Sequence, residues 1–418
     1  IIFSLATLCV TSQAQEGWTL RQCIDYAIEH NIEIQQTANE AEQNAIEVNT
    51  AKWARLPNLS GSAGQNWSWG RSQSPKDNTY SDVNSGSTQF GLNTNVPLFT
   101  GLQLPNQYAL SKLNLKAAIE DLNKAKEDIA INVTSSYLQV LFNMELSKVA
   151  ASQTELSKEQ CKRIIRLAEV GKASSAEVAE AKARVAQDEM SLVQAENNYQ
   201  LALLDLSQLL ELPTPEGFTL AQPDTVVNFV PLTAPDDIYT EALSNKPGIR
   251  AAQFRLEGSE KSIRIAQSNY YPQLSFGASI GTNFYTLNGS AEHSFGSQLK
   301  NNLNKGIGFN LSVPLFNRLA TRNRVRSARL QQTNLALQLD NTKKVLYKEI
   351  QQAWYNAVAA ESKFNSSMAA VTANEESFRL MSEKFDNGKA TFVEYNEAKQ
   401  NLTTVSYTHL TLPTNSRV

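Results

Sequence analysis

The residues Val96-Pro97-Leu98-Phe99 return as Val313-Pro314-Leu315-Phe316, a separation of 217 positions in this 418-residue chain. The same 217 positions separate Gly171-Lys172-Ala173 from Gly388-Lys389-Ala390. A separation that does not change over so long a stretch indicates rigid elements, because loops accumulate insertions and deletions. The sequence therefore predicts two tandem repeats of one structural unit.

Two stretches with a period of two residues lie in each repeat, and the second of each pair contains the repeated motif. The predicted strands are 58-70, 88-99, 273-286 and 305-316. They carry no charge across their middles and have aromatic residues near their ends. Soluble β-sandwiches also alternate, but this pattern suits transmembrane strands with one face toward lipid and one toward a wet lumen.

Four strands cannot close a barrel across a membrane, because an open edge in lipid leaves backbone groups unpaired. Several copies of the chain must therefore share one barrel. Two copies would supply about 8 strands and three about 12, and both numbers fit known barrels. Strand counting alone does not choose between a dimer and a trimer.

Long helical hairpins are predicted behind the strands, over 102-210 and 317-405. Apolar residues there recur at spacings of three and four, and proline is absent from the helix interiors. A helix from 102 to 168 would be roughly 100 Å long and must pack beside equally long partners. Gly171 and Gly388 suit the left-handed residue that ends a helix, and a capping box follows each glycine.

Shorter helices are predicted before the strands, over 20-54 and 238-268. The resulting plan is a first repeat over 15-212, a proline-rich linker over 213-235 and a second repeat over 236-405. Short strands are expected within that linker near 226-230.

The two ends of the chain differ from the repeats. Residues 1-14 join an apolar run to Ser12-Gln13-Ala14 and are interpreted as the remnant of a signal peptide. Residues 406-418 form a tail rich in β-branched residues that contains a proline. We expect this tail to be non-helical, as a truncated reading frame or a cloning scar would be.

Composition argues against several functions. The net charge is −3, which gives no case for nucleic-acid binding. The cysteines and histidines have no metal-type spacing, so no metal site or cofactor is predicted. Gly277-Ala278-Ser279-Ile280-Gly281 matches the nucleophile-elbow pattern, but that motif needs a strand, a turn and a helix. Here the alternation continues through the motif, and no enzyme is predicted.

The order of these elements resembles the TolC-like outer-membrane efflux protein family over nearly the whole mature chain. The shared order is helix, strand pair ending in Val-Pro-Leu-Phe, long helix, glycine tip and return helix, given twice. The resemblance implies mixed α and transmembrane β structure, with four strands per protomer in a shared trimeric outer-membrane barrel. It also implies that the helical hairpins form a periplasmic tunnel of twelve helices.

The resemblance further implies the function of an exit duct in the outer membrane of a Gram-negative bacterium. Such a duct serves a tripartite efflux pump or a type I secretion system and opens at its periplasmic tip. An inner-membrane transporter supplies the energy, and a periplasmic adaptor docks on the hairpin tips. The cargo is not specified by the sequence.

Site residues are carried over from the family motif by motif. The tips assigned to adaptor docking are Val170, Gly171, Lys172, Ala173, Asn387, Gly388, Lys389, Ala390 and Thr391. The carboxylates assigned to the closed entrance are Glu177, Glu180, Glu394 and Glu397. The strand–helix junctions are Pro97 and Pro314. Three copies of the carboxylates around an axis would favour cations.

Two observations qualify this assignment. Glu177 and Glu394 are also explained as capping residues near a helix N-terminus. The family can place an arginine after the tip glycine to lock the entrance, whereas the nearby cations here are Lys172 and Lys389. A lock in this chain would be built differently.

Two other functions are weighed against the duct. A periplasmic coiled-coil adaptor or scaffold would use the long helices but leave four alternating strands without a role. An enzyme inside a barrel would need a convergent polar site in the lumen.

Overall fold

The computed structural model describes residues 17–73, 78–82, 84–221, 231–288, 291 and 293–415, with only the backbone for 72, 81 and 406–415. The predicted signal remnant and the strands expected near 226–230 lie outside the described residues. The chain divides into two compact units. Unit 1 comprises Ile1–Asn39, Asp121–Ile249 and Thr342–Val418, and unit 2 comprises Glu40–Glu120 and Arg250–Asn341.

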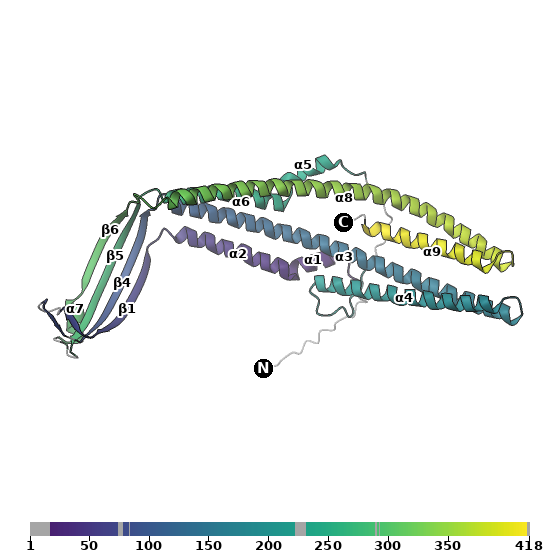
Figure 1. Cartoon of the computed structure of the whole chain (residues 1–418), viewed down its shortest axis with the longest axis horizontal. Helices are drawn as coiled ribbons and strands as arrows, with labels where there is room; N and C mark the ends of the chain where they lie inside the picture. Colours follow the sequence, from purple (N-terminus) through teal and green to yellow (C-terminus); the bar gives the residue numbers. More distant parts are fainter. Residues whose placement is uncertain are drawn as a thin grey trace, which may run out of the picture. The chain divides into compact units, whose positions relative to one another are not determined.

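Unit 2 contains a four-stranded antiparallel sheet whose order is β1-β4-β5-β6 (Figure 1). The strands are β1 (Asn58–Ser68), β4 (Ser85–Phe99), β5 (Gln273–Leu287) and β6 (Asn304–Ser312). Each repeat supplies one β-hairpin, and the two hairpins join where β4 pairs with β5. The sheet is therefore shared between the repeats.

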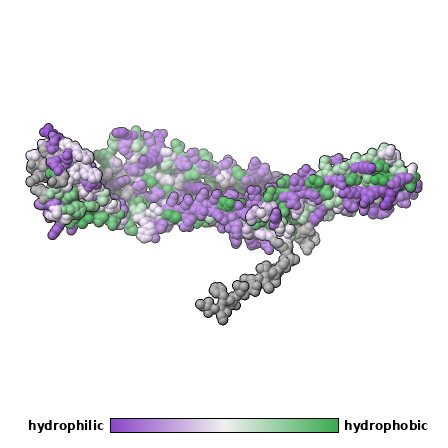
Figure 2. Space-filling model, turned by 90° about the horizontal axis from the view of Figure 1, so that it is seen from below, coloured by the Kyte–Doolittle hydropathy of each residue, from purple (hydrophilic) through white to green (hydrophobic). Residues whose placement is uncertain are grey.

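The strand register gathers the apolar side chains on one face of the sheet. Val96 lies opposite Phe276, which in turn lies opposite Phe309, and the two phenylalanine rings are 5.3 Å apart. Leu92 lies opposite Ile280 on the same face. Large apolar side chains there stay open to the surroundings, since Ile307 is 82% exposed. Figure 2 shows green residues over part of the sheet and mainly purple residues along the helices.

The second strand of the second repeat is shorter than predicted, because β6 ends at Ser312 rather than at 316. Ser312 pairs with Gln273, the first residue of β5, so no neighbouring strand continues beyond it. In the first repeat, Pro97 stays inside β4 with a register shift beside it. Pro314 follows the end of β6, where a missing N–H breaks no ladder.

The strand–helix junction has the same backbone in both repeats. Two residues in succession have positive φ before each long helix, Gly101 and Leu102 in the first copy and Arg318 and Leu319 in the second. The predicted proline junctions thus precede a repeated left-handed turn. Of these four turn residues, only Gly101 is a glycine. A Cβ added at Gly101 would lie 2.6 Å from the Ser268 carbonyl oxygen, so the close approach requires glycine there.

The loops at the other end of the sheet contain elements that the sequence did not predict. β2 (Arg71–Gln73) pairs with β3 (Tyr80–Asp82), and α7 (Phe295–Asn301) lies against β5. Gln298 on α7 is 3% exposed and takes the place of a strand neighbour. Its Oε1 accepts from the Tyr285 N–H at 3.0 Å, and its Nε2 donates to the Tyr285 carbonyl oxygen at 3.0 Å. This pairing covers the edge of β5 beyond the reach of β6.

The long helices confirm the repeat. α3 (Gln103–Glu169) and α8 (Ala320–Asp386) are 67 residues each, and both ends of α8 lie 217 positions after those of α3. The return helices are α4 (Ser175–Leu209) and α9 (Phe392–Asn415), whose first residues are again 217 positions apart. Figure 1 shows each long helix folding back into its return helix.

The tail prediction differs from the structure, because α9 continues ten residues beyond Val405 to Asn415. Extending a formed helix fixes one residue for each added hydrogen bond, whereas starting one fixes several. β-Branched residues lower helix propensity by only a few tenths of a kcal/mol each, and about 0.7 kcal/mol at most. They therefore do not stop a helix that is already formed.

Each shorter helix predicted as continuous is in fact two. Asn31 is extended (φ −63°, ψ 130°) between α1 (Leu20–His30) and α2 (Ile32–Trp53), and its Oδ1 accepts from the Glu33 N–H at 2.9 Å. It thereby caps α2. The second break lies at Lys246, between α5 (Pro235–Asn245) and α6 (Pro247–Ser268). Pro247 disfavours the helical conformation of the residue before it.

The apolar core of unit 1 forms where α1, the first turn of α2, α3, α4 and the segment after α4 meet. Its buried members are Cys23, Ala27, Ile34, Ile129, Val133, Tyr137, Val140, Ala202, Leu203, Leu206, Leu210 and Phe218. The Tyr137 hydroxyl donates to the Ala221 carbonyl oxygen at 2.9 Å, so the buried phenol is satisfied. Burial raises the pKa of Cys23 to about 11, which keeps the thiol neutral.

Across the described ranges, no helix has both the length and the apolar character of a membrane span.

Candidate functional site

The first hairpin tip is shaped by a glycine with positive φ. At Gly171 φ is +72°, and its N–H donates to the Ala168 carbonyl oxygen at 2.9 Å. The Lys172 N–H donates to the Leu167 carbonyl oxygen at 2.8 Å, which completes a Schellman motif. A Cβ at Gly171 would meet nothing within 4 Å, so backbone conformation rather than space calls for glycine.

The second tip repeats this geometry at Gly388, where φ is +69°. Its N–H donates to the Phe385 carbonyl oxygen at 3.1 Å, and the Lys389 N–H donates to the Lys384 carbonyl oxygen at 2.8 Å. The predicted tip residues therefore sit on two matching turns. Both lysines are exposed, as are Val170 and Asn387.

The predicted capping boxes are present in both repeats. Glu177 accepts from the Ser174 N–H at 2.6 Å, while the Ser174 hydroxyl oxygen accepts from the Glu177 N–H at 3.2 Å. Glu394 and Thr391 form the same pair at 2.7 Å and 3.2 Å. The backbone hydrogen bond is the main reason that the pKa of each glutamate lies below its usual value. Both carboxylates are therefore ionised at neutral pH and engaged in caps.

The other two predicted carboxylates, Glu180 and Glu397, lie one helical turn further on. Both are exposed, and neither side-chain carboxylate has a hydrogen bond or ion pair with any residue in the part of the chain that the structure describes. The structure thus separates the four glutamates into two capping residues and two available surface charges.

An apolar cluster joins the two hairpins near their tips. Its buried members are Cys161, Ile164, Ala181 and Phe392, with Ile165, Ala173, Val178, Val185 and Phe385 packed against them. The first hairpin supplies most of the cluster, and Phe385 and Phe392 come from the second. Phe385 also contacts Tyr395, with ring centroids 5.1 Å apart. This packing holds the second tip against the first.

An arginine of the first hairpin binds the second one beside this cluster. The Arg163 guanidinium donates to the Asp386 carboxylate and lies 5.2 Å from the centroid of the Phe385 ring. Arg163 therefore contributes a cation across the hairpins, eight positions before the tip glycine Gly171.

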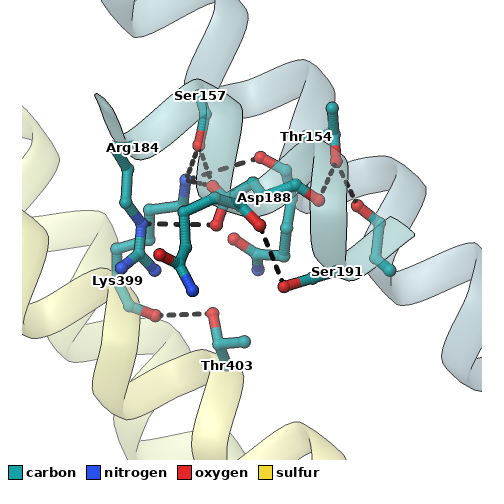
Figure 3. A network of polar contacts seen from close by, with 10 residues as sticks. Thr154, Ser157, Arg184, Asp188, Ser191, Lys399 and Thr403 are labelled. Carbon is teal, nitrogen blue, oxygen red and sulfur yellow. Dashed lines mark hydrogen bonds and ion pairs between the residues drawn. The ribbon is translucent and has the colours of Figure 1, made fainter. Parts of the chain in front are cut away.

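A second cation crosses between the hairpins deeper in unit 1. Lys399 of α9 is 3% exposed, and its Nζ donates to Ser157 Oγ at 2.5 Å and lies 3.4 Å from Asp188 Oδ2 (Figure 3). Asp188 is 8% exposed, accepts from the Ser157 hydroxyl and lies 3.3 Å from Arg184 Nε. Burial lowers the pKa of Lys399 more than the attraction of Asp188 raises it. The ammonium is held in a polar site that is nearly closed to solvent.

Neither of these contacts was predicted from the sequence. Asp188 falls on the inward stripe of α4 that also holds Ala181 and Val185, so its position already indicated a buried charge. Its counterpart 217 positions later is Val405, and the counterpart of Lys399 is the exposed Lys182. The repeat therefore predicted no such pair, because the contact exists only between the two copies.

The nucleophile-elbow pattern has no catalytic geometry. Ser279 lies within β5, paired across both neighbouring strands, as the alternation predicted. Within the described ranges, no group of three or more His, Cys, Asp or Glu side chains could hold a metal ion.

Comparison with known proteins agrees with this geometry. The family model described as "Outer membrane efflux protein" matches residues 23–211 and 238–415, which follow the two repeats. TolC of Escherichia coli K12 is 23% identical over 97% of this chain and 82% of its own length. The outer-membrane efflux protein BepC of Brucella suis is 20% identical over 96% of this chain and 83% of its own length.

Solved structures share the fold as well. The CmeC outer membrane channel of Campylobacter jejuni superposes with a TM-score of 0.83 at 19% identity, covering 95% of this chain and 83% of that one. Two tandem repeats, a shared four-stranded sheet and two long helical hairpins define an outer-membrane transport protein. The chain belongs to the outer membrane efflux protein family. It is an exit duct for efflux in the outer membrane of a Gram-negative bacterium. The family match therefore supports the duct rather than the periplasmic scaffold.

Proposed function

We propose that the chain assembles as a homotrimer around a passive duct that is closed at the hairpin tips. The sheet supports this assembly, because β1 and β6 each pair on one side only in the described chain. An unpaired strand edge in lipid leaves N–H and C=O groups without partners, and a second copy can supply them. Three copies would give a barrel of about twelve strands.

The closed gate rests on the contacts between the two hairpins. Arg163 bound to Asp386, Lys399 bound near Asp188 and the apolar cluster keep the second tip against the first. Opening requires these contacts to separate in each protomer. Glu180 and Glu397 would then lie near the entrance with Glu177 and Glu394, where repeated carboxylates favour cations. The absent tip arginine of the family has a functional substitute in Arg163 and Lys399.

The tips are also the proposed docking site for a periplasmic adaptor, which links the duct to an inner-membrane transporter. Val170 to Ala173 and Asn387 to Thr391 form two exposed turns of equal geometry. Two matching turns per protomer would present six similar contacts around a trimer, which suits a symmetric partner. The transported cargo would depend mainly on the transporter.

The first test is the native mass of the detergent-extracted particle. A mass of three chains supports the duct, whereas a monomer that stays soluble without detergent would support a scaffold instead. Planar-bilayer conductance then tests the gate. Arg163→Ala should raise the conductance, while Arg166→Ala, an exposed arginine one turn later on α3, should not. Equal conductance of the two variants would contradict the proposed role of Arg163.

A further inference from the structure

The beginning of α8 carries an unusual excess of positive charge. The chain has no aspartate or glutamate from His293 to Leu339 but seven lysines and arginines. Five arginines lie between Arg318 and Arg329, here called the basic segment. The corresponding stretch of the first repeat, 101–112, has a single cation at Lys112. The charge is therefore not a consequence of the repeat.

The arginines of α8 fall on two opposite sides of the helix. At about 100° per residue, Arg322, Arg326 and Arg329 lie within roughly 60° of one another. Arg324 points about 170° away from the middle of that group. All four are exposed, and the three on the shared side have no ion pair with any described residue. These three form the arginine stripe.

Arg324 lies on the side of α8 that faces in the same direction as the polar face of the sheet. Arg324 lines a hollow of about 230 Å³ together with Gln273 and Ser312. Those two residues pair across β5 and β6, one step from the apolar pair Leu274 and Leu311. Successive strand residues point to opposite faces, so Gln273 and Ser312 belong to the polar face. The arginine stripe consequently lies on the side of the apolar face.

The apolar face of the sheet runs almost directly into the basic segment. Leu315 and Phe316 are 92% and 81% exposed, and Arg318 follows two residues later. Exposed apolar and aromatic residues followed at once by basic residues are typical of the boundary between the lipid interior and the head groups. Along α8 the stripe from Arg322 to Arg329 spans about 10 Å.

We propose that Arg322, Arg326 and Arg329 bind the phosphate groups of anionic phospholipids in the membrane leaflet nearest the helices. A guanidinium makes paired hydrogen bonds to phosphate, and an uncompensated basic patch beside an apolar surface attracts lipids with net negative charge. This binding would fix the depth of the sheet in the membrane at the strand–helix junction. The inference rests on the proposed orientation of the duct, with the apolar face toward lipid.

The test uses the full-length protein in detergent, titrated with phosphatidylglycerol or phosphatidylcholine, with retained lipid counted by native mass spectrometry. We expect phosphatidylglycerol to bind more tightly. The triple variant Arg322→Gln/Arg326→Gln/Arg329→Gln should lose this preference by on the order of 100-fold, at about fivefold per arginine. The matched control Arg324→Gln, on the opposite side of the same helix, should keep it.

A competition experiment identifies the ligand, and single variants keep the test valid if the triple variant misfolds. Millimolar inorganic phosphate should not displace phosphatidylglycerol, and full displacement would show a general anion site and overturn the lipid assignment. Equal binding of the two lipids, or an equal loss in Arg324→Gln, would also overturn it. If the triple variant does not fold, the single variant Arg326→Gln should lose about fivefold, and Arg326→Lys should restore most of that loss. The native mass and conductance measured on the same samples test the duct separately.

Discussion

Replacing Asp188 should destabilise the contact between α9 and the first hairpin more than replacing its partner Lys399. Asp188→Asn leaves a buried ammonium beside Arg184 with no carboxylate, and removing one partner of a buried pair costs about 3 to 5 kcal/mol. Lys399→Met leaves Asp188 bound to Ser157 and Arg184. It loses the hydrogen bonds that Lys399 Nζ donates to Ser157 Oγ at 2.5 Å and, at 3.4 Å, to the Gln153 carbonyl oxygen and Asp188 Oδ2. The short charge-assisted bond accounts for about 1.5 to 3 kcal/mol, and part of this is regained by removing a buried charge.

Amide hydrogen exchange of α9 in the detergent-extracted protein measures this difference. Asp188→Asn should speed exchange about 100- to 4,000-fold, which corresponds to the cost above at about 1.4 kcal/mol per tenfold. The increase in the α9 exchange rate should be at least several-fold smaller in Lys399→Met than in Asp188→Asn. Lys182→Met is the matched control, because Lys182 occupies the equivalent position in the first repeat and is exposed.

A double variant and a pH series sharpen the test. Asp188→Leu/Lys399→Met should recover much of the stability lost in Asp188→Asn, since it leaves no buried charge unpaired. The lowered pKa of Lys399 means that the folded state binds fewer protons than the unfolded state between that pKa and the ordinary value of 10.5. Stability should therefore rise with pH in that window, and Lys399→Met should lack this rise. Greater damage from Lys399→Met than from Asp188→Asn would refute the reasoning.

Two further predictions concern the sheet edge and the tips. Gln298→Leu should lower thermal stability, because it leaves the partly buried N–H and C=O of Tyr285 unpaired, at up to about 1 to 3 kcal/mol each. Calorimetry should show no loss if the edge is not covered. Below the ordinary glutamate pKa of about 4.5, the caps at Glu177 and Glu394 should weaken as the pH falls through their lowered pKa values. The protection factors of the tip amides, measured against the intrinsic exchange rate at each pH, should fall at acid pH, and Glu177→Gln/Glu394→Gln should remove most of this pH dependence.

Much of the fold follows from periodicity and local chemistry in the sequence. The separation of 217 positions, the alternation of the strands and the glycine tips predicted the repeat, the sheet and both hairpins. These signals are local, because strand alternation, helix periodicity and capping depend on residues a few positions apart. Local rules also located the candidate tips and the two capping glutamates correctly.

The breaks at Asn31 and Lys246 have local causes in the sequence. Pro247 was visible in the sequence and should have ended the preceding helix. Asn31 gives a weaker signal, because asparagine caps helices but also occurs within them. The end of β6 at Ser312 depended on where its neighbour β5 begins, which no property of residues 313–316 reveals.

What the sequence determined by itself is the repeated plan, the family resemblance and the position of the tips. Only the tertiary structure decided how the two copies meet: the order of strands across the sheet, Arg163 on Asp386 and Lys399 beside Asp188. The physical reason is that each repeat carries its own local signals, whereas these contacts between the repeats join residues about 175 to 223 positions apart. Those contacts need not repeat with the separation of 217 positions. The two copies differ in sequence, and a residue in one copy faces a different surface from its counterpart in the other.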